Sequence, residues 1–305
     1  MNRREAFEHQ ARHFARTSPL YERLALELRD EPLVPLDVHW RYPLQLLAGL
    51  HYLALSGRAS WGDVRGALHD EAEFLRDWIA TERVQTNEVQ RCWWLLPGFL
   101  EVARRDGVET FDCLELGCSA GLNLLWDRYG YAYAAGSWPP DPASCSLQLA
   151  GEERGGRVPA ELLGLRPVVR SRVGVDLAPP DLRTDEGVRL LKSFVWADQA
   201  ERLARLDAAV AVWRDDPPEV VVGDVLDELP ALLARGPSLV WSTAALSYLP
   251  SERQRAVREL VAESGVPFVE GWVPADGSHD YYGLFVDGRE VAHAEFHGAW
   301  LDWRA

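Results

Sequence analysis

The sequence predicts a mixed α/β protein, in which a mostly parallel β-sheet ends in an antiparallel hairpin and follows an all-helical N-terminal cap. Three observations predict this fold class. The N-terminal third carries helix signals and few strand signals. From Phe111 onward, short apolar runs alternate with helical patterns, which implies parallel strands joined by helices. Near the end of the chain, two runs flank the turn residues Asp287-Gly288, a pattern typical of a hairpin.

The helical cap is expected to extend from residue 1 to residue 107. In its segments, apolar side chains recur three or four residues apart, the spacing of one face of a helix. The last segment begins with Asn87 followed by Gln90, which predicts a capped helix start. The predicted segments, the third of which divides into two shorter turns, are Pro19–Arg29, Tyr42–Leu55, Trp61–Ile79 and Asn87–Arg104.

The α/β part is expected to extend from residue 108 to residue 305. Between its first two strands, residues 136–168 are rich in Gly and Pro, which indicates an insertion, with one short candidate strand at Ser146–Leu149. Helices are expected at 185–213, 224–233 and 251–262. The predicted strands are Phe111–Leu116, Val168–Asp176, Glu219–Gly223, Ser238–Thr243 and Val266–Val273, and the hairpin runs are Tyr281–Val286 and Glu290–Phe296.

The turn after the first strand is the most informative stretch of the chain. In Phe111–Trp126 (FDCLELGCSAGLNLLW), an apolar strand leads through small residues into a helical pattern. Gly117 and Gly121 allow a tight turn close to a ligand. Glu115 suits a ligand that carries hydroxyls and a positive charge. Dinucleotide-binding turns follow the pattern G-x-G-x-x-G, whereas this turn reads E-x-G-x-x-x-G, with Ser119 in place of a middle glycine.

Charge and cysteine usage restrict the class of partner. The formal net charge is −15, from 47 acids and 32 bases, which argues against nucleic acid or an anionic membrane as a partner. The 4 cysteines show no C-x-x-C pair and no Cys/His ligand spacing, so neither a disulfide framework nor a metal site is expected. The sequence shows no signal-peptide core and no long apolar run. We therefore expect a cytoplasmic protein with a small-molecule substrate, and the oligomeric state stays open.

Beyond this turn, the chain resembles class I S-adenosylmethionine-dependent methyltransferases over roughly residues 108–305. Those enzymes keep acids at the ends of the first three strands, where this chain has Glu115, Asp176 and Asp224. The resemblance implies a Rossmann-like fold, S-adenosylmethionine as cofactor and methyl transfer to a small molecule. It implies cofactor contacts from Asn87, Glu88, Glu115, Gly117, Ser119, Gly121, Asn123, Asp176, Leu177, Asp224 and Val225. The whole chain, including Thr86–Arg91 (TNEVQR), also resembles a bacterial family of uncharacterised proteins grouped with these methyltransferases.

The acceptor is expected beyond the carboxyl ends of the fourth and fifth strands. Tyr248, His279 and Asp280 fall there and are the predicted catalytic residues, with His279 and Asp280 as the base for a protonated acceptor. The chain departs from the methyltransferase pattern between Gly121 and Asp176, which are separated by far more than the usual ~20 residues.

Simpler interpretations of the same residues stay open. Asp224 could be the N-cap of a helix, and Asn87 with Glu88 could be an N-cap and its first-turn acid. Gly117 and Gly121 could serve strand-to-helix packing alone. The alternative functions are a non-catalytic or cofactor-sensing module with this fold and an NAD-linked oxidoreductase. The missing middle glycine and the three acids at strand ends argue against the oxidoreductase.

Overall fold

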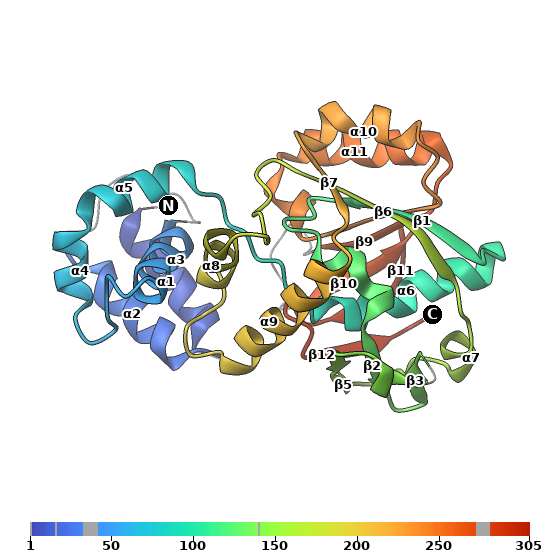
Figure 1. Cartoon of the computed structure of the whole chain (residues 1–305), viewed down its shortest axis with the longest axis horizontal. Helices are drawn as coiled ribbons and strands as arrows, with labels where there is room; N and C mark the ends of the chain where they lie inside the picture. Colours follow the sequence, from blue (N-terminus) through green and yellow to red (C-terminus); the bar gives the residue numbers. More distant parts are fainter. Residues whose placement is uncertain (1, 16, 33–41, 140, 273–280) are drawn as a thin grey trace. The chain divides into compact units, whose positions relative to one another are not determined.

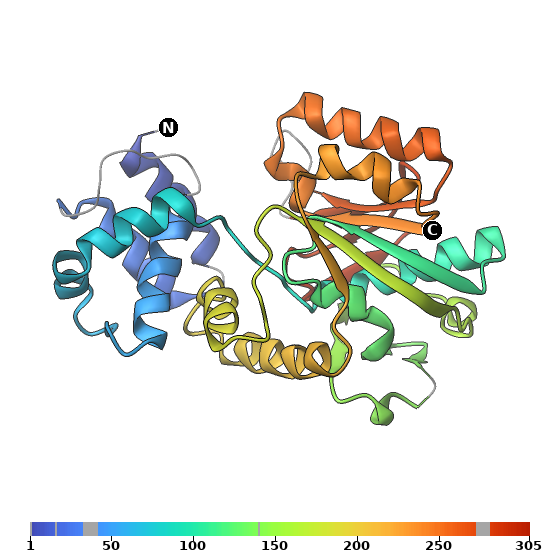
Figure 2. The same ribbon diagram turned by 45° about the horizontal axis from the view of Figure 1, so that its top comes forward.

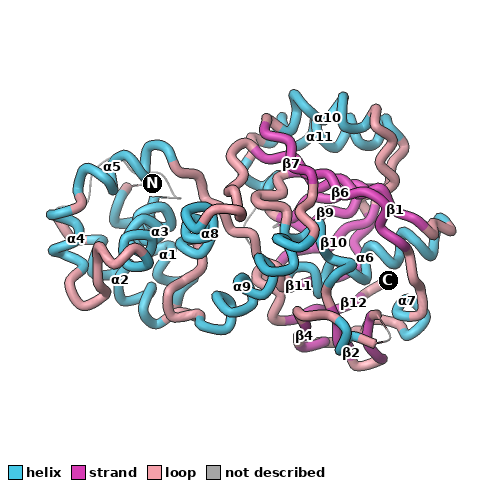
Figure 3. The backbone as a smooth tube through the Cα atoms, viewed as in Figure 1, coloured by secondary structure: helices cyan, strands magenta, loops and turns pink. Residues whose placement is uncertain are grey.

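The protein has a mixed α/β fold with one large, mostly parallel sheet, as the sequence predicts (Figures 1 and 3). The structure is a computed structural model that describes residues 2–15, 17–32, 42–139, 141–272 and 281–305. Within these ranges, no helix is both long enough and apolar enough to cross a membrane.

The chain forms two compact units. The first is Met1–Thr86 with Pro180–Asp207, and the second is Asn87–Pro179 with Ala208–Ala305. These bounds differ from the predicted division at residue 107. The difference arises because the helix before the first strand packs within the second unit, whereas a segment that follows the second strand packs within the first.

The first unit is helical (Figure 3). Its buried core joins Phe14, Tyr21, Leu24 and Leu50 from successive helices. Two predicted segments coincide with observed helices residue for residue, and the third divides in two as expected. The helices are α1 (Arg3–Phe14), α2 (Pro19–Arg29), α3 (Tyr42–Leu55), α4 (Val64–Asp70), α5 (Ala72–Thr81) and α8 (Asp185–Ser193).

The segment from residue 180 to residue 207 is tied into the first unit by polar contacts. Asp198 Oδ1 accepts a hydrogen bond from Ser18 Oγ at 2.6 Å, and its Oδ2 accepts one from Leu20 N at 3.1 Å. Ser18 is also the N-cap of α2, where its side chain accepts from Tyr21 N. His51 Nδ1 of α3 lies 2.9 Å from Val195 O. These contacts explain why a segment distant in sequence belongs to this unit.

The second unit contains a nine-stranded sheet in the order β5-β12-β11-β10-β9-β8-β1-β6-β7. The strands β7, β6, β1, β8 and β9 run parallel, and β10, β11 and β12 continue antiparallel. The predicted hairpin is confirmed as β10 and β11, whereas β12 and β5 were not predicted. The strands are β1 (Thr110–Leu116), β5 (Glu152–Glu153), β6 (Val168–Asp176), β7 (Glu219–Val222), β8 (Leu239–Thr243), β9 (Phe268–Trp272), β10 (Tyr282–Val286), β11 (Arg289–Ala294) and β12 (Trp300–Trp303).

Helices cover both faces of the parallel part of this sheet. On one face, α10 (Val225–Leu233) and α11 (Ser251–Ser264) pack against alternate residues of β1, β6, β8 and β9 in a single apolar cluster (Figure 2). On the other face lies α6 (Arg91–Asp106), where an added Cβ on Gly98 would come within 3.3 Å of side-chain atoms of Val269 and Leu284. A further helix, α9 (Ala200–Asp215), precedes β7.

The helix predicted directly after the glycine turn is a 3₁₀ helix, η1 (Leu122–Arg128), with a non-helical residue at Leu125. Two tyrosine hydroxyls bond to carbonyls of this segment. Tyr129 Oη donates to Leu122 O at 2.7 Å, and Tyr131 Oη donates to Trp126 O at 2.6 Å.

Two strands of the predicted insertion, β3 and β4, form a small sheet with β2, which precedes the insertion, in the order β3-β2-β4. Its single predicted strand, at Ser146–Leu149, is observed as β4, shifted toward the C-terminus. The elements of this region are β2 (Gly130–Tyr133), β3 (Gly136–Trp138), η2 (Pro142–Ser144), β4 (Gln148–Ala150) and α7 (Ala160–Leu163).

The contacts of Asp198 make a prediction for the first unit. Asp198→Ala removes two acceptors, and we expect it to lower the free energy of unfolding by about 1–2 kcal/mol. Asp207→Ala breaks an exposed ion pair with Lys192 (2.6 Å) and should cost less than about 1 kcal/mol. Urea unfolding followed by circular dichroism measures both variants, and equal losses in the two would contradict the assigned role of Asp198.

Candidate functional site

The order of the parallel strands places the candidate site at one edge of the sheet. From β1 the chain proceeds to β6 and β7 on one side, then crosses to β8 and β9 on the other. In open α/β sheets, ligands bind outside the carboxyl ends of the strands where the order reverses. Here the reversal lies between β1 and β8, so the turn after β1 and the loop after β8 flank the expected site.

The backbone amides of the glycine turn are bonded within the protein. Gly117 N and Cys118 N both donate to Val175 O of β6, at 2.8 and 3.2 Å. Ser119 N donates to Asp176 Oδ2 at 2.8 Å. Gly121 N donates to Cys118 O at 2.9 Å. The turn is thus closed onto the end of β6, and these four amides are already occupied.

Packing requires glycine at both predicted positions. Gly117 has φ +73°, and an added Cβ there would come 2.1 Å from the Cβ of Ala245, in η3 (Ala245–Tyr248) after β8. Gly121 has φ +82°, and its Cβ would come 3.0 Å from Pro218 Cγ. The left-handed backbone and the close neighbours each favour glycine. The packing interpretation therefore accounts for both residues, while their cofactor contact stays a prediction.

Asp176 lies beside the turn, as the sequence predicts from its place at the end of β6. Its Oδ2 accepts from Ser119 N, and its Oδ1 accepts from Ala178 N at 3.1 Å. The side chain is only partly buried, and Leu177 next to it is 45% exposed. A carboxylate offers about four lone-pair sites. Asp176 can thus hold the turn and still accept from a ligand.

Asp224 acts as a helix N-cap. Its Oδ1 accepts a hydrogen bond from Leu226 N at 2.9 Å at the start of α10. The same oxygen accepts a hydrogen bond from Arg253 Nη2 at 2.5 Å. The simpler interpretation of Asp224 is therefore observed. The side chain stays about a fifth exposed, and Val225 beside it is partly buried. A ligand contact from this pair stays a prediction.

Glu115 is buried beneath the turn, with 1% of its surface exposed. Burial raises its pKa to about 8, and the neighbouring side chains of Trp241 and Asn123 oppose the rise. Trp241 is its register partner on β8. Its Oε2 has no hydrogen-bond partner in the described structure, nor has the buried Ser119 Oγ nearby. At neutral pH the turn therefore rests on a carboxyl that is largely protonated.

The predicted capped helix start at Asn87 is wrong. The helix begins at Arg91, and Gln90 is its N-cap residue without a side-chain cap. Asn87 Oδ1 instead accepts from Leu122 N at 3.1 Å, the first amide of η1. Glu88 is buried, and its Oε1 accepts from Gln90 N at 3.3 Å. The Asn87 side chain thus bonds to the backbone at the end of the glycine turn, and its cofactor contact stays a prediction.

A second group of side chains surrounds the start of α6, and sequence reasoning missed most of it. Arg91 Nε donates to Phe296 O at 3.0 Å, and its guanidinium lies 5.7 Å from the ring centre of Tyr282. Burial raises the pKa of Tyr282 to about 12, and Tyr248, one of the predicted catalytic residues, lies close enough to add to that rise. No spacing in the sequence indicates this group, because it joins α6, η3 and β10. His279 and Asp280 lie outside the described residues.

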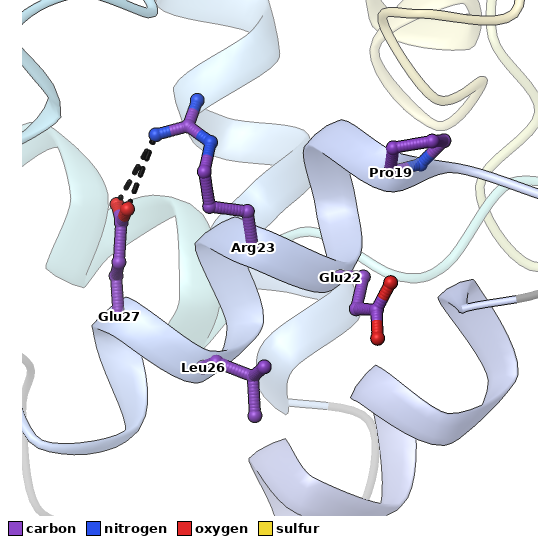
Figure 4. A pocket seen from close by; sticks show the side chains of 5 residues that line it. All are labelled: Pro19, Glu22, Arg23, Leu26 and Glu27. Atoms are coloured by element: carbon purple, nitrogen blue, oxygen red, sulfur yellow. Dashed lines mark hydrogen bonds and ion pairs between the residues drawn. The ribbon is translucent and has the colours of Figure 1, made fainter.

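A shallow surface depression of about 430 Å³ lies along α2 in the first unit (Figure 4). Its lining comes from one helix, and Arg23 and Glu27 pair with each other at 3.1 Å. These side chains do not converge on a common point where they could bind a ligand. In the ranges that the structure describes, no group of three or more His, Cys, Asp or Glu side chains is placed to hold a metal ion. The strand-end site is therefore the stronger candidate.

The close approach at Gly117 predicts a large cost of substitution. Gly117→Ala combines a left-handed backbone, about 1–2 kcal/mol, with overpacking against Ala245, about 1–3 kcal/mol. Gly265→Ala is the matched control, because Gly265 has φ +70° and no heavy atom within 4 Å of an added Cβ. Urea unfolding should show the larger loss at Gly117. A loss no greater than that at Gly265 would mean that the turn shifts to make room for the added methyl group, which would contradict this prediction.

The buried carboxyl predicts a pH-dependent stability. Folded Glu115 holds its proton up to about pH 8, whereas its ordinary pKa is 4.5, so unfolding releases a proton between these values. Its contribution to stability therefore falls as pH rises from about 4.5 to about 8, by up to about 1.4 kcal/mol per pH unit. Glu115→Gln should lack this slope. Urea unfolding of both proteins from pH 5 to pH 8 measures the difference, and a constant difference would contradict the burial effect.

Comparisons with known proteins give the family of the chain. No curated protein matches it significantly. A family model described as "Uncharacterized protein conserved in bacteria (DUF2332)" matches residues 4–303, nearly the whole chain. The expected membership in a bacterial family of uncharacterised proteins is thereby confirmed, and the protein belongs to this DUF2332 family.

Proposed function

We propose that the protein is an S-adenosylmethionine-dependent methyltransferase with a class I methyltransferase-like fold and a small-molecule acceptor. One observation carries the proposal. Acids lie at the carboxyl ends of three strands that are adjacent in the sheet, Glu115 on β1, Asp176 on β6 and Asp224 after β7. Together they supply acceptors for ribose hydroxyls, an adenine amine and an ammonium, the donor groups of this cofactor.

The occupied amides of the glycine turn support this choice over a dinucleotide. A pyrophosphate is held by free N–H groups at the turn and the following helix N-terminus. Here Gly117, Cys118, Ser119 and Gly121 donate within the protein, and the following helix is a 3₁₀ helix. A ligand recognised by carboxylates fits this turn better than one recognised by amides.

Unpartnered buried atoms support a ligand with donor groups. Glu115 Oε2 and Ser119 Oγ lack partners in the described structure. Leaving such an atom unpaired costs about 1–3 kcal/mol, and hydrogen-bond donors of a ligand would offset that cost. The bound cofactor would supply an electrophilic methyl group, and Asp176 and Glu115 would orient it beside the switch between β1 and β8. Alignment of donor and acceptor can account for much of such a rate enhancement.

The closed turn also favours a second candidate, a non-catalytic module with this fold. Contacts within the protein account for Gly117, Gly121 and the N-cap at Asp224 without any ligand. Such a module would bind the cofactor without turnover or would no longer bind it. Binding and turnover are separable measurements, so the two candidates are distinguishable.

Calorimetric titration with S-adenosylmethionine and S-adenosylhomocysteine tests the cofactor assignment. We expect saturable binding by the wild type and about tenfold or greater weakening in Asp176→Asn, because charge-assisted hydrogen bonds contribute about 1.5–3 kcal/mol. The matched control is Glu219→Gln, which changes an acid at the opposite end of β7, paired with Arg235. It should leave the affinity unchanged.

The titration has two adverse outcomes. Binding of nicotinamide dinucleotides but not of S-adenosylmethionine would move the assignment to an oxidoreductase. Folded wild-type protein that binds neither would contradict the methyltransferase proposal. Where the cofactor binds, turnover against a library of small molecules separates the enzyme from the non-catalytic module.

A further inference from the structure

Arg91 is a nearly buried cation with unusual partners. Only 7% of its surface is exposed, at the first turn of α6. Its Nε donates to the carbonyl of Phe296, and its guanidinium lies over the ring of Tyr282 at 5.7 Å. Within the described residues, no carboxylate forms an ion pair with it. One backbone bond leaves most of the five N–H donors of a guanidinium for another acceptor.

Other partly buried arginines of this unit are paired with carboxylates. Arg172 donates through two nitrogens to Asp127, at 3.3 and 2.6 Å. Arg258 donates in the same way to Glu270, at 2.9 and 2.5 Å. A charge removed from water is costly unless it is paired. Arg91 thus lacks the carboxylate partner that Arg172 and Arg258 have.

The acids close to Arg91 do not fill this role. Glu115 is near enough for the charge of Arg91 to lower its pKa, yet burial keeps that pKa at about 8, so the group is largely neutral at pH 7. Glu295 accepts from the backbone amides of His297 and Ala299 and pairs with the His297 ring at 3.4 Å. Neither of these two acids forms an ion pair with the guanidinium.

The position of Arg91 indicates which ligand group it meets. Tyr282 begins β10 and Phe296 follows β11, and β8 and β9 separate β10 from β1 in the sheet. Asp176 and Asp224 lie on the opposite side of the switch, at the ends of β6 and β7. The cation therefore lies in the half of the site where the acceptor is expected.

We propose that Arg91 anchors a carboxylate of the acceptor, so that the substrate is a small carboxylic acid bound by this guanidinium beside Tyr248 and Tyr282. The assignment of this carboxylate to the acceptor rests on the proposed function, whereas the preference of Arg91 for a carboxylate does not. A guanidinium binds a carboxylate through two parallel hydrogen bonds, which gives orientation as well as affinity. A protein of net charge −15 needs such a local cation to hold an anion.

Thermal unfolding in the presence of simple carboxylates tests the anchor. Acetate, succinate and benzoate should raise the Tm of the wild type above its value in sodium chloride of equal ionic strength. Arg91→Gln should abolish that rise, and Arg91→Lys should keep part of it. Arg104→Gln is the matched control, an exposed arginine at the far end of α6 that pairs with Glu101, and it should keep the full rise. If Arg91→Gln does not fold, the wild type alone still tests the anchor, because carboxylates should raise its Tm more than the corresponding amides do.

A second titration distinguishes the source of the carboxylate. S-adenosylmethionine carries a carboxylate, whereas 5′-methylthioadenosine lacks it. If the acceptor is the source, Arg91→Gln binds both with wild-type affinity. A loss of about tenfold for S-adenosylmethionine alone would assign the carboxylate to the cofactor and overturn the acceptor placement. No carboxylate preference in the wild type, with unchanged cofactor affinity, would overturn the anchor altogether. Wild-type protein that binds carboxylates but not the cofactor would contradict the methyltransferase proposal while leaving the anchor standing.

Discussion

The close approach of Gly117 to Ala245 is the constraint on which the candidate site depends. Where the strand order reverses, the chains leaving β1 and β8 diverge to opposite sides of the sheet. In this protein they remain so close that a single methyl group has no room between them. The turn is therefore fixed against η3 on one side and against Val175 and Asp176 of β6 on the other. A ligand at this edge meets a turn whose shape is set before binding.

Two buried ionisable groups of the candidate site, Glu115 and Arg91, differ in how they meet the cost of burial. Glu115 meets the cost of burial by keeping its proton, with its pKa raised to about 8. Arg91 has no such option, because a guanidinium stays protonated in proteins. Its partners among the described residues are a backbone carbonyl and an aromatic ring. This asymmetry explains why the carboxyl is tolerated as a neutral group while the cation calls for an anionic partner.

Periodicity and turn residues were sufficient to predict most elements, because these depend on local patterns. Pro19–Arg29, Tyr42–Leu55 and Val168–Asp176 have the predicted bounds, and the hairpin around Asp287-Gly288 is present. The 3₁₀ form of η1, with its non-helical residue Leu125, could not be predicted from the spacing of its apolar residues. The division into units also escaped prediction, because it rests on contacts such as Ser18 with Asp198, far apart in the chain.

The site shows the same limit, and it also shows where recognition must come from. The acids at strand ends could be found in the sequence because each follows an apolar run, whereas the group around Arg91 joins elements that no spacing connects. The amides of Gly117, Cys118, Ser119 and Gly121 are occupied within the protein, which limits backbone recognition of a ligand at this turn. Side chains must then provide it, with carboxylates on the β6 and β7 side and a guanidinium on the β10 side. Such a site favours donor-rich groups at one end and an anion at the other. The selectivity of the site would thus depend on the distance between the donor-rich groups and the anionic group of its ligands.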